Sequence, residues 1–385
     1  MAVLTNSDIA ELREWRRHLH RHPELSGAED WTAAEVAKAV TDTRPDEILT
    51  GLGGHGVAAI YRGTSPGPSV LLRCELDALP ITEVATHDHI SSVPGKGHLC
   101  GHDGHMAIMA GVARWLGRNR PKKGRVILLF QPAEEDGAGA KRVIEDARFA
   151  ALDVDYALSL HNAPGVAIGH ARIAAGPMNC ASRGMKILLT GRTSHASEPE
   201  KAISPTLAVS ALLRDLTDLK RGADTQDPDF ALATITYVNI GTPAFGITPG
   251  GAEIWVTLRT QLDQTMDTLV QQAEALINQH ATKSGLSVGI SFHDVFRHCV
   301  NHPDAAALLT AALEAEGIIW SDDDLPMRAS EDFGRFADIS KSAMLLLGSG
   351  IDHPRLHNPD YDFPDDLIPL GTGIFVRALN LILSQ

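Results

Sequence analysis

The segment GHLCGHDGHMAIMAG, residues 97–111, holds the densest set of side chains that could bind a metal ion. Cys100, His102, Asp103 and His105 lie within six positions, just before an apolar segment with a helical pattern. Cys100 and His102 share a face only in extended or loop backbone, whereas His102 and His105 share a face of a helix. Open α/β sheets place their sites at turns between strands and helices. The cluster therefore predicts a metal site at such a turn, with a polar loop of chance composition as the alternative.

Two adjacent glutamates, Glu134 and Glu135, follow an apolar run in the segment FQPAEEDGAGA. Successive side chains in extended backbone point to opposite sides, so one carboxylate can bind a metal while the other faces a substrate. A solvated acidic turn is the alternative for this pair taken alone. If Glu134 acts on a substrate, we expect it to face an open, solvent-filled cleft.

Polar donors also follow other apolar runs. His161 ends the run in SLHN, and His357 follows the last run in RLHNPDYDFPDD. In RCELDALPITE, Glu75 and Asp77 share one face, and Asp77 could orient a ligand histidine through a hydrogen bond. Each histidine alone would more simply be a core or loop residue. Together the segments supply sulfur, nitrogen and oxygen donors, which suit zinc or a neighbouring first-row divalent ion.

The elements that would position these residues alternate between strand and helix. Apolar runs typical of buried strands are separated by segments with helical periodicity, which predicts an α/β fold with a mostly parallel sheet covered on both faces. A later run, at 343–348, fits the same sheet. The strand-like runs are 57–61, 70–74, 125–130 and 155–160, and the helical segments are 7–22, 28–41, 104–118 and 138–148.

The middle of the chain has a different pattern, strand-helix-strand-strand-helix-strand. Its elements are expected at 184–190, 202–220, 231–240, 252–260, 264–283 and 286–292. A small α/β unit inserted into a larger one would explain why the strand-like runs resume after it. We therefore predict a discontinuous catalytic domain, residues 1–176 and 294–385, interrupted by a second domain at 177–293.

Composition excludes several other classes of protein. The 385 residues include 34 Lys and Arg against 48 Asp and Glu, and the resulting net charge of −14 disfavours nucleic acid and anionic membranes as partners. No apolar stretch approaches the ~20 residues of a membrane span, and the first residues lack the apolar core of a signal peptide. The four cysteines form no CxxC pair, which favours free thiols in a reducing compartment. We therefore expect a cytoplasmic protein.

The order and spacing of the motifs resemble the amidohydrolase branch of the co-catalytic metallopeptidases. This family includes hippurate hydrolases, N-acyl-amino-acid aminoacylases and indole-acetyl-amino-acid hydrolases. The resemblance covers nearly the whole chain and rests on RRHLHRHPELSGAE, LDALPI, GHLCGHDGHMAIMAG, FQPAEE, SLHN, TGRTSHASEPEKAISP, SEDF and LHNPDYDFPDD. It implies hydrolysis of the amide bond of a small N-acyl amino acid, with two divalent metal ions (zinc, manganese, cobalt or nickel) as cofactors.

Carried over to this sequence, the resemblance also implies residue roles. Cys100 would bridge the two metal ions, and Glu134 would be the general base. His195, in TSHASEP, would come from a ferredoxin-like inserted domain and reach the active site of a partner subunit in a homodimer. Asp77 and Asp103 would support the ligand side chains. The remaining metal ligands would be His102, Glu135, His161 and His357.

Three positions bear on substrate preference. Arg259, in WVTLRT, could bind a substrate carboxylate through two parallel hydrogen bonds, a geometry that lysine cannot reproduce. A salt bridge on an exposed strand is the alternative for this arginine. Glu75 stands where the family usually has Asp, and Gly246 stands where relatives have Asn, so we expect the pocket to differ from that of other members.

Other functions remain open from the sequence. A carboxypeptidase or dipeptidase of the same family would share the whole motif set. A hydrolase with Cys100 as nucleophile, activated by His102 or His105, would leave Glu135 and the later histidines unexplained. A zinc deaminase would need a P-C-x-x-C motif, which is absent from the sequence. A metal-binding assembly protein would not need Glu134 beside Glu135.

Overall fold

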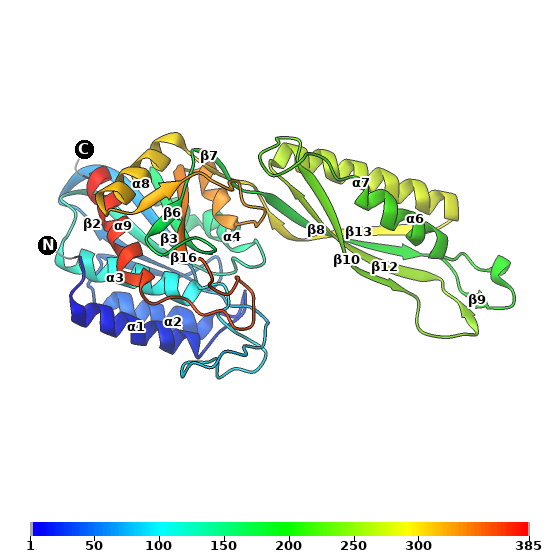
Figure 1. Ribbon diagram of the computed structural model, residues 1–385, viewed down its shortest axis with the longest axis horizontal. Helices are drawn as coiled ribbons and strands as arrows, with labels where there is room; N and C mark the ends of the chain where they lie inside the picture. The colour runs from blue at the N-terminus through cyan, green and yellow to red at the C-terminus, as the bar shows by residue number, and fades with distance from the viewer. Residues whose placement is uncertain (1–2, 384–385) are drawn as a thin grey trace. The chain divides into compact units, whose positions relative to one another are not determined.

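The computed structural model describes residues 3–383, which divide into two compact units (Figure 1). The first unit holds the chain up to Met178, Cys299–Leu325 and the chain from Asp332 onward. The second holds Asn179–His298 and Pro326–Glu331. Each unit has its own sheet and its own hydrophobic core.

The sheet of the first unit has eight strands, and its four central strands are parallel. The prediction of a mostly parallel sheet is wrong for the outer strands, because β1, β2 and β4 pair antiparallel and so do β6 and β16. Only residues 63–64 join β2 to β3, and so short a link must reverse the chain direction. The order is β1 (Glu47–Leu52), β2 (Gly56–Arg62), β4 (Lys123–Gln131), β3 (Ser65–Glu75), β5 (Tyr156–Pro164), β16 (Lys341–Gly350), β6 (His170–Arg172) and β15 (Ile319–Ser321).

Both faces of this sheet are buried, as continuous apolar runs require. In β4, Val126 and Leu128 pack into the core shared with α1, α2, α3, α8 and α9, while Ile127 and Leu129 are equally buried on the other face. The smaller helices α4 and α5 and the 3-10 helix η2 complete the unit. The helices are α1 (Asn6–His20), α2 (Asp30–Thr41), α3 (His102–Arg118), α4 (Gly139–Glu145), α5 (Ala147–Ala150), α8 (Pro303–Ala315), η2 (Asp332–Asp338) and α9 (Leu367–Leu383).

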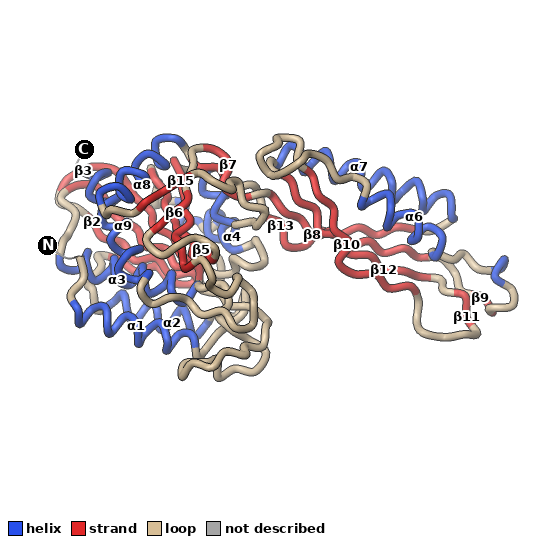
Figure 2. Tube along the Cα trace, in the orientation of Figure 1, coloured by secondary structure: helices blue, strands red, loops and turns tan. Residues whose placement is uncertain are grey.

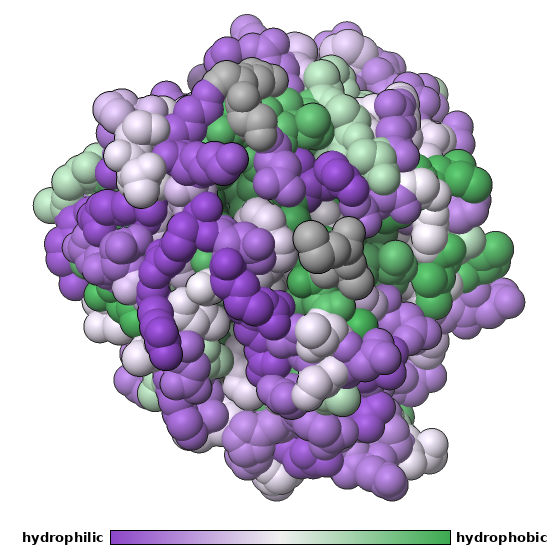
Figure 3. Space-filling model, turned by 90° about the vertical axis from the view of Figure 1, so that its left-hand side faces the viewer, coloured by the Kyte–Doolittle hydropathy of each residue, from purple (hydrophilic) through white to green (hydrophobic). Residues whose placement is uncertain are grey.

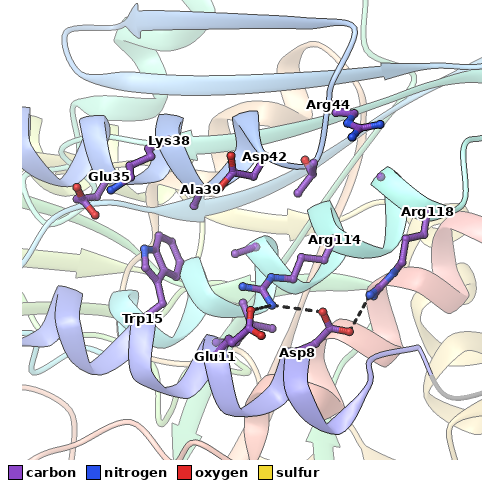
Figure 4. A pocket seen from close by; sticks show the side chains of 14 residues that line it. Asp8, Glu11, Trp15, Glu35, Lys38, Ala39, Asp42, Arg44, Arg114 and Arg118 are labelled. Atoms are coloured by element: carbon purple, nitrogen blue, oxygen red, sulfur yellow. Dashed lines mark hydrogen bonds and ion pairs between the residues drawn. The ribbon is translucent and has the colours of Figure 1, made fainter.

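A groove of about 570 Å³ lies between α1, α2 and the C-terminal half of α3 (Figure 4). Four of its charged side chains form ion pairs: Arg114 donates to Asp8 and Glu11 at 3.3 and 2.8 Å, and Arg118 donates to Asp8 at 2.9 Å. Asp8 also closes a capping box with Thr5 at the start of α1. These ion pairs join α1 to the end of α3 that is remote from the cysteine-histidine cluster.

The second unit is a four-stranded antiparallel sheet with two helices on one face (Figure 2). Its elements run along the chain as strand, helix, strand, strand, helix and strand. A two-stranded ribbon, β9 (Ser194–His195) with β11 (Ile247–Thr248), extends from it, next to η1 (Pro199–Lys201). The main elements are β8 (Ala181–Thr190), α6 (Thr206–Thr217), β10 (Ala231–Ile240), β12 (Gly251–Thr260), α7 (Asp263–Ser284) and β13 (Ser287–Phe296).

Two short strands, β7 (Gly176–Asn179) and β14 (Cys299–Asn301), pair with each other where the chain leaves and re-enters the first unit. Within residues 3–383, no helix is both long and apolar enough to cross a membrane. Hydrophilic side chains cover most of the face drawn in Figure 3, with hydrophobic ones visible between them.

Candidate metal centre

A glycine makes the turn that presents the cysteine-histidine cluster. Gly101, the residue before α3, has a φ of 92°, and a Cβ there would lie 2.4 Å from the Asn162 side-chain oxygen. Only glycine fits both constraints. The turn places Cys100 at the end of a loop and His102 in the first turn of the helix.

Five donor side chains from four chain segments converge in the first unit. The Cys100 Sγ lies 3.5 Å from His161 Nε2, and Glu135 Oε1 lies 3.9 Å from His102 Nε2 and 3.7 Å from His357 Nε2. Bonds of about 2.0–2.3 Å to zinc place neighbouring tetrahedral ligand atoms about 3.3–3.6 Å apart. The donors form two groups that share Cys100, one with His102 and His161 and one with Glu135 and His357. The spacings lie within a few tenths of an ångström of this range, so these side chains could hold divalent metal ions.

Two of the histidines are oriented by their other ring nitrogen. His102 Nδ1 donates to the backbone oxygen of Asp77 at 2.9 Å, and His161 Nδ1 donates to that of Asn162 at 2.8 Å. The Nε2 of His102 is then buried without a hydrogen-bond partner in the described part of the chain. A ligand histidine characteristically donates its second N–H in this way, so the residues fit a bound metal.

Asp77 supports two of the candidate ligands at once. Its carboxylate accepts from the Glu135 backbone N–H at 2.9 Å and from Ser26 Oγ at 2.8 Å, and it lies 3.4 Å from His102 Nδ1. Asp103 is placed differently, although the sequence groups it with the ligands. The Asp103 carboxylate is buried and accepts from His20 Nδ1 at 2.9 Å and from Arg16 at 3.1 Å.

His105 belongs to a buried network beneath the cluster. Its Nδ1 lies 2.6 Å from Glu75, and its Nε2 accepts from the Asn162 backbone N–H at 3.2 Å. Glu75 also pairs with Arg73, whose guanidinium reaches Asp332 at 2.6 Å. Sequence reasoning missed Arg73 and assigned no partner to Asp332. The Glu75 carboxylate thus contacts both His105 and Arg73.

The ionisation of the cluster argues against a cysteine nucleophile. Burial, followed by the charges of Glu135 and Glu134, raises the pKa of Cys100 well above its ordinary value. Burial alone would lower the pKa of His102, but Asp77 and the nearby glutamates outweigh it and raise this pKa to about 10. A protonated His102 cannot take the proton of the Cys100 thiol, so His102 does not serve as the activating base. A bound cation would favour the thiolate and the neutral imidazole, as metal ligation requires.

The other two histidines are suited to act as neutral donors. Burial is the largest cause that lowers the pKa of His161, to about 3, and burial also lowers the pKa of His357. Glu134, the other glutamate of the pair, is only 5% exposed and accepts from the Asp332 backbone N–H at 3.4 Å. The expectation that Glu134 faces an open, solvent-filled cleft is therefore wrong.

His195 lies in the second unit, on the exposed ribbon of β9 and β11. Its Nδ1 accepts from the Ser197 backbone N–H at 3.2 Å and from the Ser197 hydroxyl at 2.7 Å. The neutral ring therefore carries its proton on Nε2, where it can be donated. Gly246 precedes the strand that pairs with His195, and a Cβ at Gly246 would meet open space.

Arg259 is also in the second unit, on β12, and is partly buried. One of its terminal nitrogens donates to the Arg328 backbone oxygen at 2.8 Å and to Ser330 Oγ at 3.1 Å. Among residues 3–383 it makes no ion pair with a carboxylate, so the salt bridge considered as the alternative is not found. Burial lowers the pKa of Arg259, which leaves a partly desolvated cation that an anionic ligand would stabilise.

The donor set in the first unit, with Glu134 beside it, indicates a metal-dependent hydrolase. Residues 71–381 match the model of peptidase family M20/M25/M40, so the chain belongs to that family and is a metal-dependent amidohydrolase. N-acetyl-L-cysteine deacetylase of Bacillus subtilis is 31% identical over 376 residues, which cover 96% of this chain and 88% of that protein. IAA-amino acid hydrolase ILR1-like 5 of Arabidopsis thaliana is 30% identical over 372 residues, with 93% and 83% covered.

A solved structure is similar over the same extent. The YxeP protein of Bacillus subtilis, described as a dinuclear metal-binding peptidase of family M20, matches with a TM-score of 0.82 and 24% identity. The match covers 99% of this chain and 99% of that one. This likeness supports the α/β fold with its large mixed sheet.

Proposed function

We propose that the protein hydrolyses the amide bond of N-acyl amino acids, releasing a carboxylic acid and a free amino acid. The observation that carries the proposal is the convergence of five metal-binding donors in two groups that share Cys100. The names of two relatives, an N-acetyl-L-cysteine deacetylase and an IAA-amino acid hydrolase, support this class of substrate.

The ligands would be Cys100, His102, Glu135, His161 and His357. Two divalent ions held there, whether zinc, manganese, cobalt or nickel, would polarise the amide carbonyl. They would also lower the pKa of a water molecule, so that it can lose a proton and attack that carbonyl. Glu134 accepts the proton that the attacking water loses and delivers it to the leaving nitrogen, a role worth ~10²–10⁴-fold in rate. Asp77 keeps His102 and Glu135 in position through the contacts described above.

His195 of the partner subunit would donate its Nε2 proton to the oxyanion of the tetrahedral intermediate. The Ser197 contacts that fix the tautomer support this role, because they leave Nε2–H as the donor. Loss of one oxyanion donor costs about 100-fold or more in rate. Arg259 would bind the α-carboxylate of the substrate, which fits its lack of a carboxylate partner among the described residues.

We further propose that the protein is a homodimer joined through the second unit, whose element order is that of a ferredoxin-like domain. The face of the sheet opposite the helices carries Leu188, Tyr237 and Trp255, which are 43%, 42% and 45% exposed. Tyr237 and Trp255 lie 5.2 Å apart, ring centre to ring centre, and β10 is an edge strand that could pair across a two-fold axis. The four cysteines are free in the structure, which fits the expected reducing, cytoplasmic location.

A substrate panel tests the reaction and separates it from the carboxypeptidase or dipeptidase alternative. The panel holds acetyl-, benzoyl- and indole-acetyl-amino acids, each beside its carboxamide, and unblocked dipeptides. We expect turnover of the N-acyl acids and much slower turnover of the carboxamides. Preference for dipeptides would favour the alternative, and equal turnover of acids and carboxamides would exclude the carboxylate contact.

A further inference from the structure

A second cluster of histidines and carboxylates lies in the first unit and shares no side chain with the candidate ligands above. His20 comes from α1, whereas Glu83 and His87 come from the irregular segment that leads into Cys100. The Nε2 atoms of His20 and His87 lie 3.1 and 3.0 Å from the same oxygen of Glu83. These separations approach the ~3.3 Å expected between ligand atoms around a tetrahedral zinc ion.

The orientation of His20 is typical of a metal ligand. Its Nδ1 lies 2.9 Å from the buried Asp103 carboxylate, which turns Nε2 toward Glu83. A carboxylate behind a histidine fixes the tautomer and raises the basicity of the ligand nitrogen. Asp103 is thus placed to orient a ligand histidine, but this histidine is His20 and not His102.

Neighbouring imidazoles extend the donor set. His87 stacks on His89, with ring centres 3.8 Å apart and an interplanar angle of 12°. Asp362 Oδ2 lies 2.9 Å from His89 Nε2 and 3.9 Å from His87 Nε2. The three side chains form a second group of possible ligands that shares His87 with the first.

The cluster has more negative than positive charge. Arg16 is its buried cation and contacts three carboxylates: Asp103 at 3.1 Å, Asp362 at 2.6 Å and Asp365 at 2.7 Å. Asp365 also pairs with Arg17 at 2.8 Å, so with Glu83 four carboxylates face two guanidinium groups when the histidines are neutral. A divalent cation would offset most of this excess. Without one, protonation of histidines such as His20 must do so.

Unpartnered ring nitrogens are the independent sign of a missing ligand. His98 is 1% exposed, its ring centre lies 6.3 Å from that of His20, and neither of its ring nitrogens has a hydrogen-bond partner among residues 3–383. Both ring nitrogens of His87 are likewise buried without a hydrogen bond, although Nε2 lies 3.0 Å from the Glu83 carboxylate. Buried polar groups without partners are uncommon and call for a bound ion or water.

We propose that His20, Glu83 and His87 form a further divalent-cation site, of the zinc class, which is distinct from the two ions of the proposed catalytic centre. The ion would fasten α1 to the segment before Cys100. Asp362, five residues after His357, would bring a second ligand-bearing segment to the same point. The site would therefore stabilise the approach to the catalytic centre without touching substrate.

The test compares zinc stoichiometry in the full-length protein and a His87→Ala variant. Both are freed of metal with a chelator, dialysed to equilibrium against buffered zinc, and measured by elemental analysis and circular dichroism. We expect the variant to stay folded and to bind one zinc ion fewer per chain. Its melting temperature should also rise less on zinc addition. His55→Ala is the matched control, because the His55 side chain has nearly the same exposure, 22% against 21%, and lies outside the cluster.

The possible outcomes separate this site from the catalytic one. Loss of one ion in His87→Ala but not in His55→Ala supports the proposal, and Cys100→Ala should leave that ion bound. Equal zinc content in wild type and His87→Ala would overturn it and leave an ion-paired histidine cluster only. Loss of one ion in both histidine variants would also overturn it, because it would indicate adventitious surface binding.

Discussion

The candidate metal centre of the first unit and the polar residues of the second unit are built in opposite ways. His102 and Glu134 are buried, and neighbouring groups hold them before any ligand arrives. His195 is exposed on a two-stranded ribbon, and Arg259 reaches only a backbone oxygen and a hydroxyl. The proposed metal ligand and general base are thus fixed by core packing. Groups that would recognise substrate or complete the site keep donor capacity for a partner.

The largest effect is expected from Glu134→Gln. If Glu134 is the general base, kcat should fall by at least ~10²–10⁴-fold, because the amide cannot accept the proton. Metal content should stay unchanged, because Glu134 is not among the proposed ligands. Steady-state kinetics on the best N-acyl substrate and elemental analysis of the same preparation measure both quantities.

The neighbouring glutamate supplies the control for that comparison. Glu135→Gln should lose bound metal as well as activity, since Glu135 Oε1 faces both His102 and His357. If Glu134→Gln keeps more than about a tenth of the wild-type rate, the general base lies elsewhere. Because Glu134 is buried, thermal unfolding of the variant must also be measured.

Removal of the shared ligand should abolish activity through metal loss. Cys100→Ala takes away the one donor common to both groups, so we expect it to bind fewer ions of the catalytic pair. Chelation of the wild type should give the same loss of activity, and added zinc or manganese should restore it. A chelator-treated, metal-free protein with full activity would contradict the metal mechanism and revive the cysteine nucleophile.

The difference between the two regions also explains what could be predicted from the sequence. Glu135 and His161 are recognisable because each is a strong donor that follows an apolar run, and Cys100 because it is clustered with histidines just before one. Arg73 and its partner Asp332 are 259 positions apart, and no local pattern links them. The partners of Asp103 were missed for the same reason, because a motif gives the residue type but not the direction of the side chain.

His195→Ala should lower the rate by about 100-fold or more if its Nε2–H stabilises the oxyanion. In the proposed dimer, His195 of one subunit completes the active site of the other. We therefore predict that mixing His195→Ala chains with Glu134→Gln chains restores part of the activity. A mixed dimer would contain one site with both residues intact. Lack of rescue between chains shown to exchange, for example by mass spectrometry, would exclude the role across subunits.

A smaller effect is expected for Arg259→Lys. Lysine keeps the charge but loses the two-pronged contact with a carboxylate, so KM should rise by about tenfold while kcat changes less. The increase should disappear with a carboxamide substrate. Arg192→Lys is the matched control, because Arg192 lies in the same unit and also donates to a backbone oxygen, that of Lys201. Equal effects of both substitutions would remove Arg259 from substrate binding.

The fold was predictable where burial is complete and less so elsewhere. The runs that became β3, β4, β5 and β16 are continuous because both faces of those strands are covered. Helix α9 was not predicted, because LIPLGTGIFVRALNLIL is apolar on most of its circumference and few polar residues mark an exposed face. The three-residue strands β6 and β15 are too short to show any alternation.

The smallest effect is expected from Asp8→Asn, a substitution in the groove of Figure 4. It should change the stability of the protein without changing its metal content. Burial acts to raise the pKa of Asp8, but hydrogen bonds from Thr5, Arg118 and Arg114 outweigh it and lower this pKa to about 2. Because the pKa is lower in the folded state, the ionised Asp8 carboxylate stabilises the fold at any pH above its unfolded-state pKa of 3.8. This stabilisation is lost as the pH falls through about 2. Asp8→Asn should therefore melt at a lower temperature than wild type at pH 7, and the gap should narrow toward pH 2. A gap of constant size between pH 7 and pH 2 would mean that the contacts of Asp8 act through shape rather than charge.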